Sequence, residues 1–531
     1  TGYSRGGSRS ETTNFVREVN QEWTLGADKE FGKIRVNGFV GGNKMEREAE
    51  NINISGTTFN VPFFASVINT SSQSIGYGYS KSGINSLFGS AEVSYGGFVY
   101  ITATGRNDWF SVLNPKNNSK FYPSVGGSFV FTDAFNTLPE WLSFGKLRAA
   151  WGQVATANVG AYAVVPTYSL LGQGHQSVPM GTFAFGETIP NPNLNPALSS
   201  EIEFGTDLKF FNGRVGLELT YYTQKTVDDI LDATISQSSG FNATKVNIGE
   251  LSNKGYEILV SGTPVQGEIT WDISLNLAHN ENKVVELAPG VTRLFIEEPR
   301  TRNAGVYHVK GMPFGMILGY KQAVDPASGK KVFDTNGYPV RSDVMEILGN
   351  GIAKMTGGLS NTVTWKRFTL DALIDYKFGG DIYSGTEVNL TGWGLHKQTL
   401  EYRDGGMPIE GVIKNTDGTY SPFSKTLTTN QDIRTYWSRL TGYAQEAFMY
   451  DASYIKLRQV QLEYKLPQTL LEKTPLTNVS VSFVGRNLWI IHRNTDNIDP
   501  ESSYTSSSGQ GIDQFAMPTT RSYGFNLRVV F

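Results

Sequence analysis

The 531-residue sequence contains no cysteine. Disulfide frameworks, thiolate metal sites and cysteine nucleophiles are therefore excluded together. The sequence also lacks any run approaching the roughly 18 consecutive apolar residues that a membrane-spanning helix needs, and its mean hydropathy is -0.27. These absences exclude a helical membrane protein. They do not exclude a membrane protein built from strands, because alternating apolar and polar residues leave the average hydropathy low.

An excess of positive charge is absent too, since 46 Lys and Arg face 49 Asp and Glu. Nucleic acid is therefore not a predicted partner. The five histidines, His175 among them, are widely spaced and form no metal-binding pattern, and no phosphate-binding loop is present. A G-x-S-x-G match at residues 2–6 follows no strand, which favours chance over a catalytic serine. We expect no cofactor, no metal and no enzymatic activity.

Aromatic residues and glycine are abundant, with 31 Phe, 25 Tyr, 9 Trp and 58 Gly, a mixture that favours strands and turns. The clearest example is "IEFGTDLKFFNGRVGLELTYY" at residues 202–222, where apolar and polar residues alternate on both sides of Asn212 and Gly213. Asn-Gly readily takes the two positive φ values of a tight type I′ turn. The stretch therefore predicts a β-hairpin with one apolar face.

The same two-residue period predicts about fifteen strands along the chain. Besides that hairpin, the predicted strands lie near residues 14–26, 32–41, 85–95, 98–106, 121–131, 145–154, 251–261, 271–279, 352–365, 368–378, 452–466, 478–489 and 521–531. One strand changes phase: in "YIKLRQVQLEYKL", Ile455 and Leu457 have one parity and Val460 and Leu462 the other. A β-bulge near Arg458 and Gln459 would absorb the extra residue.

The predicted connections alternate in length. Going back from the C-terminus, long segments at 490–519, 379–451, 281–351, 222–250 and 155–199 alternate with short ones, among them the turns at Lys366 and at Asn212-Gly213. Short turns at one end and long loops at the other are typical of an antiparallel up-and-down transmembrane β-barrel. The sequence therefore predicts an all-β outer-membrane barrel, located in the bacterial outer membrane.

Three C-terminal stretches carry a family resemblance. "DASYIKLRQVQLEYKLP" at 451–467, "VSVSFVGRNLWII" at 479–491 and "NIDPE" at 497–501 resemble the signature of SusC-like (SusC/RagA-type) TonB-dependent transporters of Bacteroidetes. The resemblance implies a barrel of about 22 strands filled by an N-terminal plug. No plug is recognisable here, and an odd strand count in a family of even-stranded barrels indicates that about seven strands lie upstream. Residues 1–531 are thus interpreted as the C-terminal part of the barrel.

The resemblance also implies a function and partners. It implies active import of an oligosaccharide or oligopeptide, driven by TonB through the plug, with a SusD-like surface lipoprotein as cap. The residues alone leave open a siderophore or cobalamin receptor, a passive porin or adhesin barrel, and a soluble all-β carbohydrate enzyme. Outer-membrane lipid and the outer-membrane assembly machinery are the remaining expected partners.

Candidate functional residues fall into three groups. Function concentrates on loops held by a rigid scaffold, so the external loop "GGDIYSGTEVNLTGWGLH" at 379–396 is expected to contact substrate through Asp381, Tyr383, Asn389 and Trp393. Asp371, Asp375 and Arg528 are predicted to face the lumen; the two aspartates, four residues apart on one strand, would lie about 13 Å apart. The face of the last strand with Tyr523, Phe525, Leu527, Val529 and Phe531 is predicted to meet lipid and to act as the assembly signal.

Overall fold

The computed structural model describes residues 6–135, 137–165, 169–171, 180–182, 188–239, 241–288, 290–300, 303–505 and 509–531. Ser4 of the G-x-S-x-G match and His175 lie outside these ranges. Contacts divide the chain into two compact units. The first comprises residues 1–129, 148–202 and 225–250, and the second comprises residues 130–147, 203–224 and 251–531.

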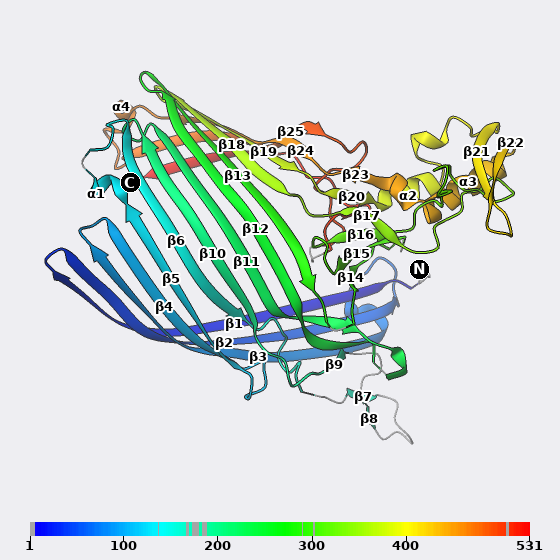
Figure 1. Ribbon diagram of the computed structural model, residues 1–531, viewed down its shortest axis with the longest axis horizontal. Helices are drawn as coiled ribbons and strands as arrows, with labels where there is room; N and C mark the ends of the chain where they lie inside the picture. Colours follow the sequence, from blue (N-terminus) through cyan, green and yellow to red (C-terminus); the bar gives the residue numbers. More distant parts are fainter. Residues whose placement is uncertain are drawn as a thin grey trace. The chain divides into compact units, whose positions relative to one another are not determined.

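Fifteen strands of the described residues follow one another in a single hydrogen-bonded order, matching the predicted strands one for one. Adjacent strands are antiparallel where their register is defined, as in β1 with β2 and β25 with β27 (Figure 1). The strands are β1 (Ser8–Phe31), β2 (Ile34–Phe59), β3 (Thr70–Tyr95), β4 (Val99–Phe110), β5 (Ser119–Val130), β6 (Leu142–Thr156), β10 (Ala197–Phe210), β11 (Val215–Thr234), β12 (Ala243–Val265), β13 (Ile269–Glu286), β18 (Met355–Trp365), β19 (Phe368–Phe378), β24 (Tyr454–Lys465), β25 (Asn478–Arg493) and β27 (Ser522–Val530).

Several strands are longer than the alternation predicted. The segment 222–250, expected to be a long connection, is mostly strand, because β11 continues to Thr234 and β12 begins at Ala243. That prediction was wrong. Backbone hydrogen bonds extend a hairpin wherever two strands remain adjacent, whereas a two-residue period marks only the part with one apolar face. The predicted short turns are present, with Asn212 and Gly213 at φ 56° and 83° and Lys366 at φ 55°.

The exposed face of the first strands carries large apolar side chains over one part of its length and ion pairs over another. On β1, alternate residues from Phe31 to Trp23 include large apolar side chains that are more than half exposed. Eight residues of strand span about 26 Å, close to the apolar band of about 25 Å on membrane barrels. Beyond this band lie ion pairs of Glu48 with Arg17 at 2.9 Å and Lys81 at 3.0 Å. Exposed Val19 and Phe15 continue on the same face of β1, so apolar and charged residues are interspersed beyond Trp23.

The predicted bulge is confirmed. The register of β24 with β19 and with β25 shifts between Leu457 and Gln459, leaving Arg458 without a directly opposed residue. Ile455 and Leu457 before the bulge oppose Tyr376 and Ile374 on β19, and the apolar parity resumes beyond it. By absorbing one extra residue, the bulge thus keeps the apolar side chains of β24 on one face of the sheet.

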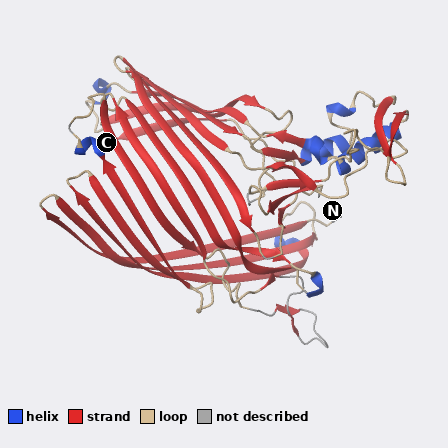
Figure 2. Cartoon of the chain, viewed as in Figure 1, coloured by secondary structure: helices blue, strands red, loops and turns tan. Residues whose placement is uncertain are grey.

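Helices and short strands occur in the connections, while the long strands run uninterrupted (Figure 2). None of the helices in the described ranges has the length and apolar character needed to cross a membrane. The helices are α1 (Phe131–Ala134), α2 (Gly385–Gly392), α3 (Asn430–Tyr443) and α4 (Gln468–Leu471), with single 3-10 turns at Val67–Asn69, Gln237–Ser239, Lys397–Thr399 and Gln445–Phe448. The short strands are β7 (Ser169–Leu171), β8 (Met180–Thr182), β9 (Thr188–Ile189), β14 (Arg293–Glu297), β15 (Ala304–Val309), β16 (Met316–Gly319), β17 (Glu346–Asn350), β20 (Asp381–Ser384), β21 (Met407–Lys414), β22 (Tyr420–Leu427), β23 (Met449–Asp451) and β26 (Ile512–Asp513).

Candidate functional site

The connection between β19 and β24 folds into a small packed unit of its own. Ser384 begins α2 by accepting a hydrogen bond from the Glu387 backbone N–H at 3.0 Å, and Thr429 begins α3 in the same way with Asp432 at 3.1 Å. Such caps satisfy backbone donors at a helix start that would otherwise have no partner. Behind the helices, β21 and β22 pair and bury Ile409 and Leu427 against Ile433 of α3. The helices are therefore held in place by the loop's own core.

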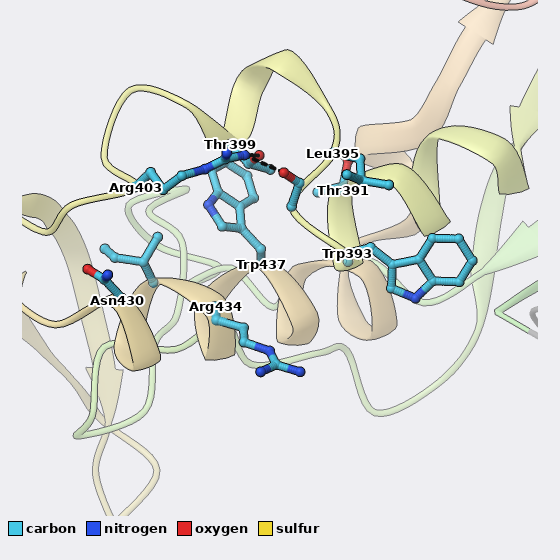
Figure 3. Close-up of a pocket in the computed structure, with 11 residues that line it drawn as sticks. Thr391, Trp393, Leu395, Thr399, Arg403, Asn430, Arg434 and Trp437 are labelled. Atoms are coloured by element: carbon cyan, nitrogen blue, oxygen red, sulfur yellow. Dashed lines mark hydrogen bonds between the residues drawn. The ribbon is translucent and has the colours of Figure 1, made fainter.

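A cavity of about 460 Å³ lies between the end of α2 and one face of α3. From α3, residues at spacings of three and four point to it, as expected for one helix face. Figure 3 shows Trp437 rising from α3 beneath Arg403, whereas Arg434 extends from the other side of the helix, away from Arg403. The lining residues are Thr391, Gly392, Trp393, Gly394, Leu395, Thr399, Arg403, Asn430, Ile433, Arg434 and Trp437.

Of the four predicted contact residues in this loop, only Trp393 lines the cavity. Its indole is 66% exposed and stacks on Phe515, with ring centroids 6.3 Å apart. Asn389 donates to the Gly385 carbonyl within α2, at 2.8 Å. Asp381 accepts from the Asn350 backbone N–H, at 2.8 Å, and lines a smaller cavity of about 310 Å³ with Lys377. The predicted residues therefore do not form one site.

The prediction that Tyr383 contacts substrate is wrong. Its side chain is 0% exposed and packs with Ala304, Ile317, Val388 and Phe448 in a core cluster. A side chain with no accessible surface cannot touch a ligand in this conformation. Its place on β20, between β23 and β26, makes it a structural residue of the loop unit.

Buried and partly buried ionic side chains attach the connection after β25 to the strands. Lys456 of β24, only 3% exposed in its side chain, contacts Asp499 at 2.7 Å and Glu501 at 2.5 Å. Arg458 holds Glu501 with two hydrogen bonds, of 2.7 and 3.0 Å, and donates to Asp375 of β19 at 3.0 Å. We call these five residues, Asp375, Lys456, Arg458, Asp499 and Glu501, the loop clamp.

The loop clamp gives a physical reason for the C-terminal signature. "NIDPE" supplies Asp499 and Glu501, "YIKLR" supplies both cations, and Asn487 of "GRN" accepts from Arg458 at 3.0 Å. Lys456 and Arg458 are two residues apart and therefore share the polar side of β24, and the bulge after Leu457 returns the apolar side chains beyond it to the opposite face. Sequence reasoning predicted the bulge and missed the partners, which lie some forty residues away with no shared period.

The other predicted residues occupy simpler surroundings. Asp371 accepts a hydrogen bond from Thr362 at 2.7 Å, and Arg528 is exposed on β27 opposite Ser480. On the predicted lipid face of β27, four side chains are between 64% and 83% exposed and Val529 is half-buried. Asp375 differs from the expectation of simple solvation, since it is paired with Arg458. The lumen-facing and assembly roles stay predictions.

The cavity residues Arg403, Arg434 and Trp437 were missed as well. The spacing of Asn430, Ile433, Arg434 and Trp437 is a helical signal that sequence reasoning could have used. Nothing local indicates that Arg403 and the end of α2 meet this face, because that contact depends on the packing of the whole connection.

Comparison with known proteins gives the family. Residues 1–488 match the family described as TonB dependent receptor-like, beta-barrel. TonB-dependent receptor P26 of Formosa agariphila is 27% identical over 99% of this chain and 54% of its own length. TonB-dependent receptor SusC of Bacteroides thetaiotaomicron is 25% identical over 84% of this chain and 43% of its own length. The chain thus spans about half the length of these relatives.

A solved structure shows the same fold. The RagAB peptide transporter matches with a TM-score of 0.77 and 20% identity, over 98% of this chain and 56% of that chain. The RagAB peptide importer in its open-open state matches with a TM-score of 0.75 and 22% identity, over the same shares of the two chains. The chain therefore belongs to the TonB-dependent receptor-like β-barrel family, is SusC-like within it, and is a protein of the outer membrane.

Proposed function

We propose that the protein imports a nutrient oligomer, an oligosaccharide or an oligopeptide, across the outer membrane. Import is driven by TonB, a SusD-like surface lipoprotein captures the cargo, and the protein catalyses no reaction. The observation that carries the proposal is the family match over residues 1–488, together with a SusC relative at 25% identity. The RagAB likeness concerns the fold, so it leaves both cargo classes in place.

The loop unit between β19 and β24 is consistent with this proposal. Its cavity is lined by aromatic, amide and hydroxyl groups, the mixture that binds sugar rings or peptide groups. Its volume of about 460 Å³ lies within the range of roughly 300 to 1,000 Å³ for small-molecule sites. Such a site on a long connection suits capture of cargo before transport.

Deletion of the complete gene in the bacterium that encodes it tests import. We expect the deletion strain to lose uptake of at least one fluorescent oligosaccharide or oligopeptide. Restoring the complete gene should restore uptake, but not in cells lacking TonB. Unchanged uptake of every oligomer would contradict the proposal, and uptake that persists without TonB would indicate a passive porin.

Two further measurements test partner and chemistry. The full-length protein, purified from its own outer membrane in detergent, should retain a surface lipoprotein, and incubation with the cargo should leave the cargo chemically unchanged. Loss of ferric siderophore uptake alone in the deletion strain would indicate a siderophore receptor. Turnover of an oligomer by the purified protein would contradict the absence of catalysis.

A further inference from the structure

We propose that the cavity between α2 and α3 is an oxyanion subsite that accepts the carboxylate or sulfate of an acidic oligosaccharide. The inference rests on the proposed function and goes beyond it, because it assigns the charge of the cargo. It stands on three features of the cavity: its uncompensated cations, a buried donor without a partner, and an aromatic platform at its open side.

The cavity is lined by cations without anions. Arg403 and Arg434 are among its eleven lining residues, and none of the eleven is Asp or Glu. Within the described ranges, neither arginine forms an ion pair with a carboxylate. Arg439, two residues beyond Trp437 on α3, bonds instead to Tyr443 at 2.8 Å and does not line the cavity. The cavity therefore carries positive charge that nothing in the described loop neutralises.

The two arginines keep donors for a ligand. Arg403 donates to the Gly394 carbonyl and, at 3.4 Å, to the Thr399 hydroxyl, both of which are neutral acceptors. A guanidinium has five N–H donors in a planar fork, so further donors remain. Arg434 is exposed on α3, and its guanidinium takes part in no hydrogen bond to a described residue. Guanidinium forks match the two oxygens of a carboxylate or sulfate.

A buried donor points to the same chemistry. The indole Nε1 of Trp437 is buried and has no hydrogen-bond partner among the described residues. Indole N–H groups donate and cannot accept, so an acceptor oxygen in the cavity would satisfy this one. Buried donors without partners are rare in folded proteins. An oxyanion bound by Arg403, which lies over the Trp437 ring, would supply acceptor oxygens beside it.

The open side of the cavity favours a ring over a flexible chain. Trp393 lines the cavity and lies nearly parallel to Phe515, at an interplanar angle of 14°, and both residues are more than half exposed. The C–H face of a pyranose packs against such aromatic rings, while the ring's acidic substituent reaches the arginines. Asn430 adds an amide group suited to sugar hydroxyls, whereas the Thr391 and Thr399 hydroxyls are buried and already bonded within the loop. The combination fits an acidic sugar unit within an oligosaccharide.

Titration of the full-length protein in detergent tests the inference. The probes are oligogalacturonate, a sulfated galactan oligosaccharide, a neutral galactan oligosaccharide of the same length, and tetraglutamate. We expect an acidic saccharide to bind about tenfold or more tighter than the neutral one. Its affinity should fall as salt is raised. Equal binding of acidic and neutral oligosaccharides, or tetraglutamate binding as tightly as the acidic saccharides, would overturn the assignment.

Variants locate the binding. Arg434→Gln loses no internal partner, so its fold is expected to be intact, and combined with Arg403→Gln it should remove most of the preference for acidic saccharides. Trp437→Phe keeps the ring and removes only the donor, and should weaken acidic binding severalfold. Arg439→Gln, on the same helix but outside the cavity, is the matched control and should bind as the wild type does. A double variant with unchanged preference would refute the site.

These titrations are independent of import. If the deletion strain imports every oligomer normally, the proposed function fails whatever the purified protein binds. If import is lost but acidic and neutral oligosaccharides bind alike, import stands and the oxyanion subsite fails.

Discussion

The ammonium group of Lys456 lies in a side chain that is 3% exposed, between the carboxylates of Asp499 and Glu501. Removing one partner of a buried ion pair leaves the other charge uncompensated, which costs far more than losing a surface pair. At the residue scale, the stability of the loop after β25 therefore depends on a few buried charges. Exposed pairs such as Lys465 with Glu463, 3.9 Å apart, contribute little.

Replacing Lys456 by Met tests this difference. We expect Lys456→Met to lower the free energy of unfolding by about 3 to 5 kcal/mol and to expose the segment around Asp499 to protease. Lys465→Met, on the same strand, should change stability by no more than about 0.5 kcal/mol. Urea unfolding in lipid vesicles and limited proteolysis measure both effects. Equal effects of the two substitutions would contradict the clamp.

The loop clamp also sets a pH dependence. Burial by itself would raise the pKa of Asp499, but hydrogen bonds from Lys456, the Glu501 backbone and Thr519 outweigh burial and hold its pKa at about 2. Burial would likewise raise the pKa of Glu501, but hydrogen bonds from Arg458 and Lys456 outweigh burial and lower this pKa to about 2. Both values lie below those of unfolded chains, about 3.9 for Asp and 4.3 for Glu.

Carboxylates with lowered pKa values stabilise the fold fully above their unfolded pKa, and this stabilisation is lost as pH falls toward the folded value. We therefore expect hydrogen exchange of residues 494–505, corrected for its intrinsic pH dependence, to be constant from about pH 8 to 5 and to rise between about pH 4 and 2. Lys456→Met should abolish most of this protection. A transition near neutral pH would show that another group controls the loop.

At the scale of elements, the bulge in β24 reconciles two demands on one strand. Lipid requires Ile455, Leu457, Val460 and Leu462 to share a face, although their spacing does not permit it in a regular strand. The bulge absorbs the extra residue, Arg458, whose side chain is itself used in the loop clamp. A single local irregularity thus serves the membrane face and the loop attachment together.

Deleting Arg458 removes the extra residue of the bulge, so β24 becomes a regular strand that still keeps Ile455, Leu457, Val460 and Leu462 on one face. The deletion also removes the guanidinium that holds Glu501. We therefore expect the deletion variant to reach the outer membrane in normal amounts, as measured by immunoblot of membrane fractions, and its segment around Glu501 to become more sensitive to protease. Arg458→Ala, which keeps the bulge and loses the same ion pairs, is the control and should behave alike. Strong loss of the deletion variant from the membrane, without loss of Arg458→Ala, would mean that the bulge itself is required.

At the scale of the whole molecule, successive side chains along the strands of the sheet alternate between an exposed apolar face and a polar face. On β27, Phe525 is 83% exposed, and its neighbour Asn526 belongs to the opposite face. Across the sheet, Phe525 opposes Phe483 of β25, with ring centroids 5.4 Å apart. This continuous aromatic surface has no protein partner among the described residues, as expected for a face that meets lipid.

An arginine scan of β27 distinguishes the faces. Phe525→Arg should lower the free energy of unfolding by about 2 to 4 kcal/mol near the midplane, because a charge would enter the hydrocarbon. Asn526→Arg should be tolerated on a polar face. Urea unfolding of protein folded into vesicles measures both. Greater destabilisation by Asn526→Arg would show that Asn526, and not Phe525, faces the lipid.

The sequence by itself determined the strands, their phase, the short turns and the bulge. These depend on local geometry, because side chains alternate along any strand and lipid demands that one face stay apolar. The strand ends in β11 and β12 were missed because polar pairing outside the apolar band has no period. The family signature was recognisable from the amino-acid sequence, but the ion pairs that explain it were not.

Only the tertiary structure decided how the connections are used. In the folded chain Tyr383, predicted from the sequence to contact substrate, is buried, and Arg403 lies at the face of α3. The tertiary structure also joined Asp499 and Glu501 to Lys456 and Arg458 across about forty residues. Loops have no repeating pattern, and their contacts arise from packing and charge pairing between distant segments. The scaffold could therefore be predicted from local order, whereas the cavity and the loop clamp required the folded chain.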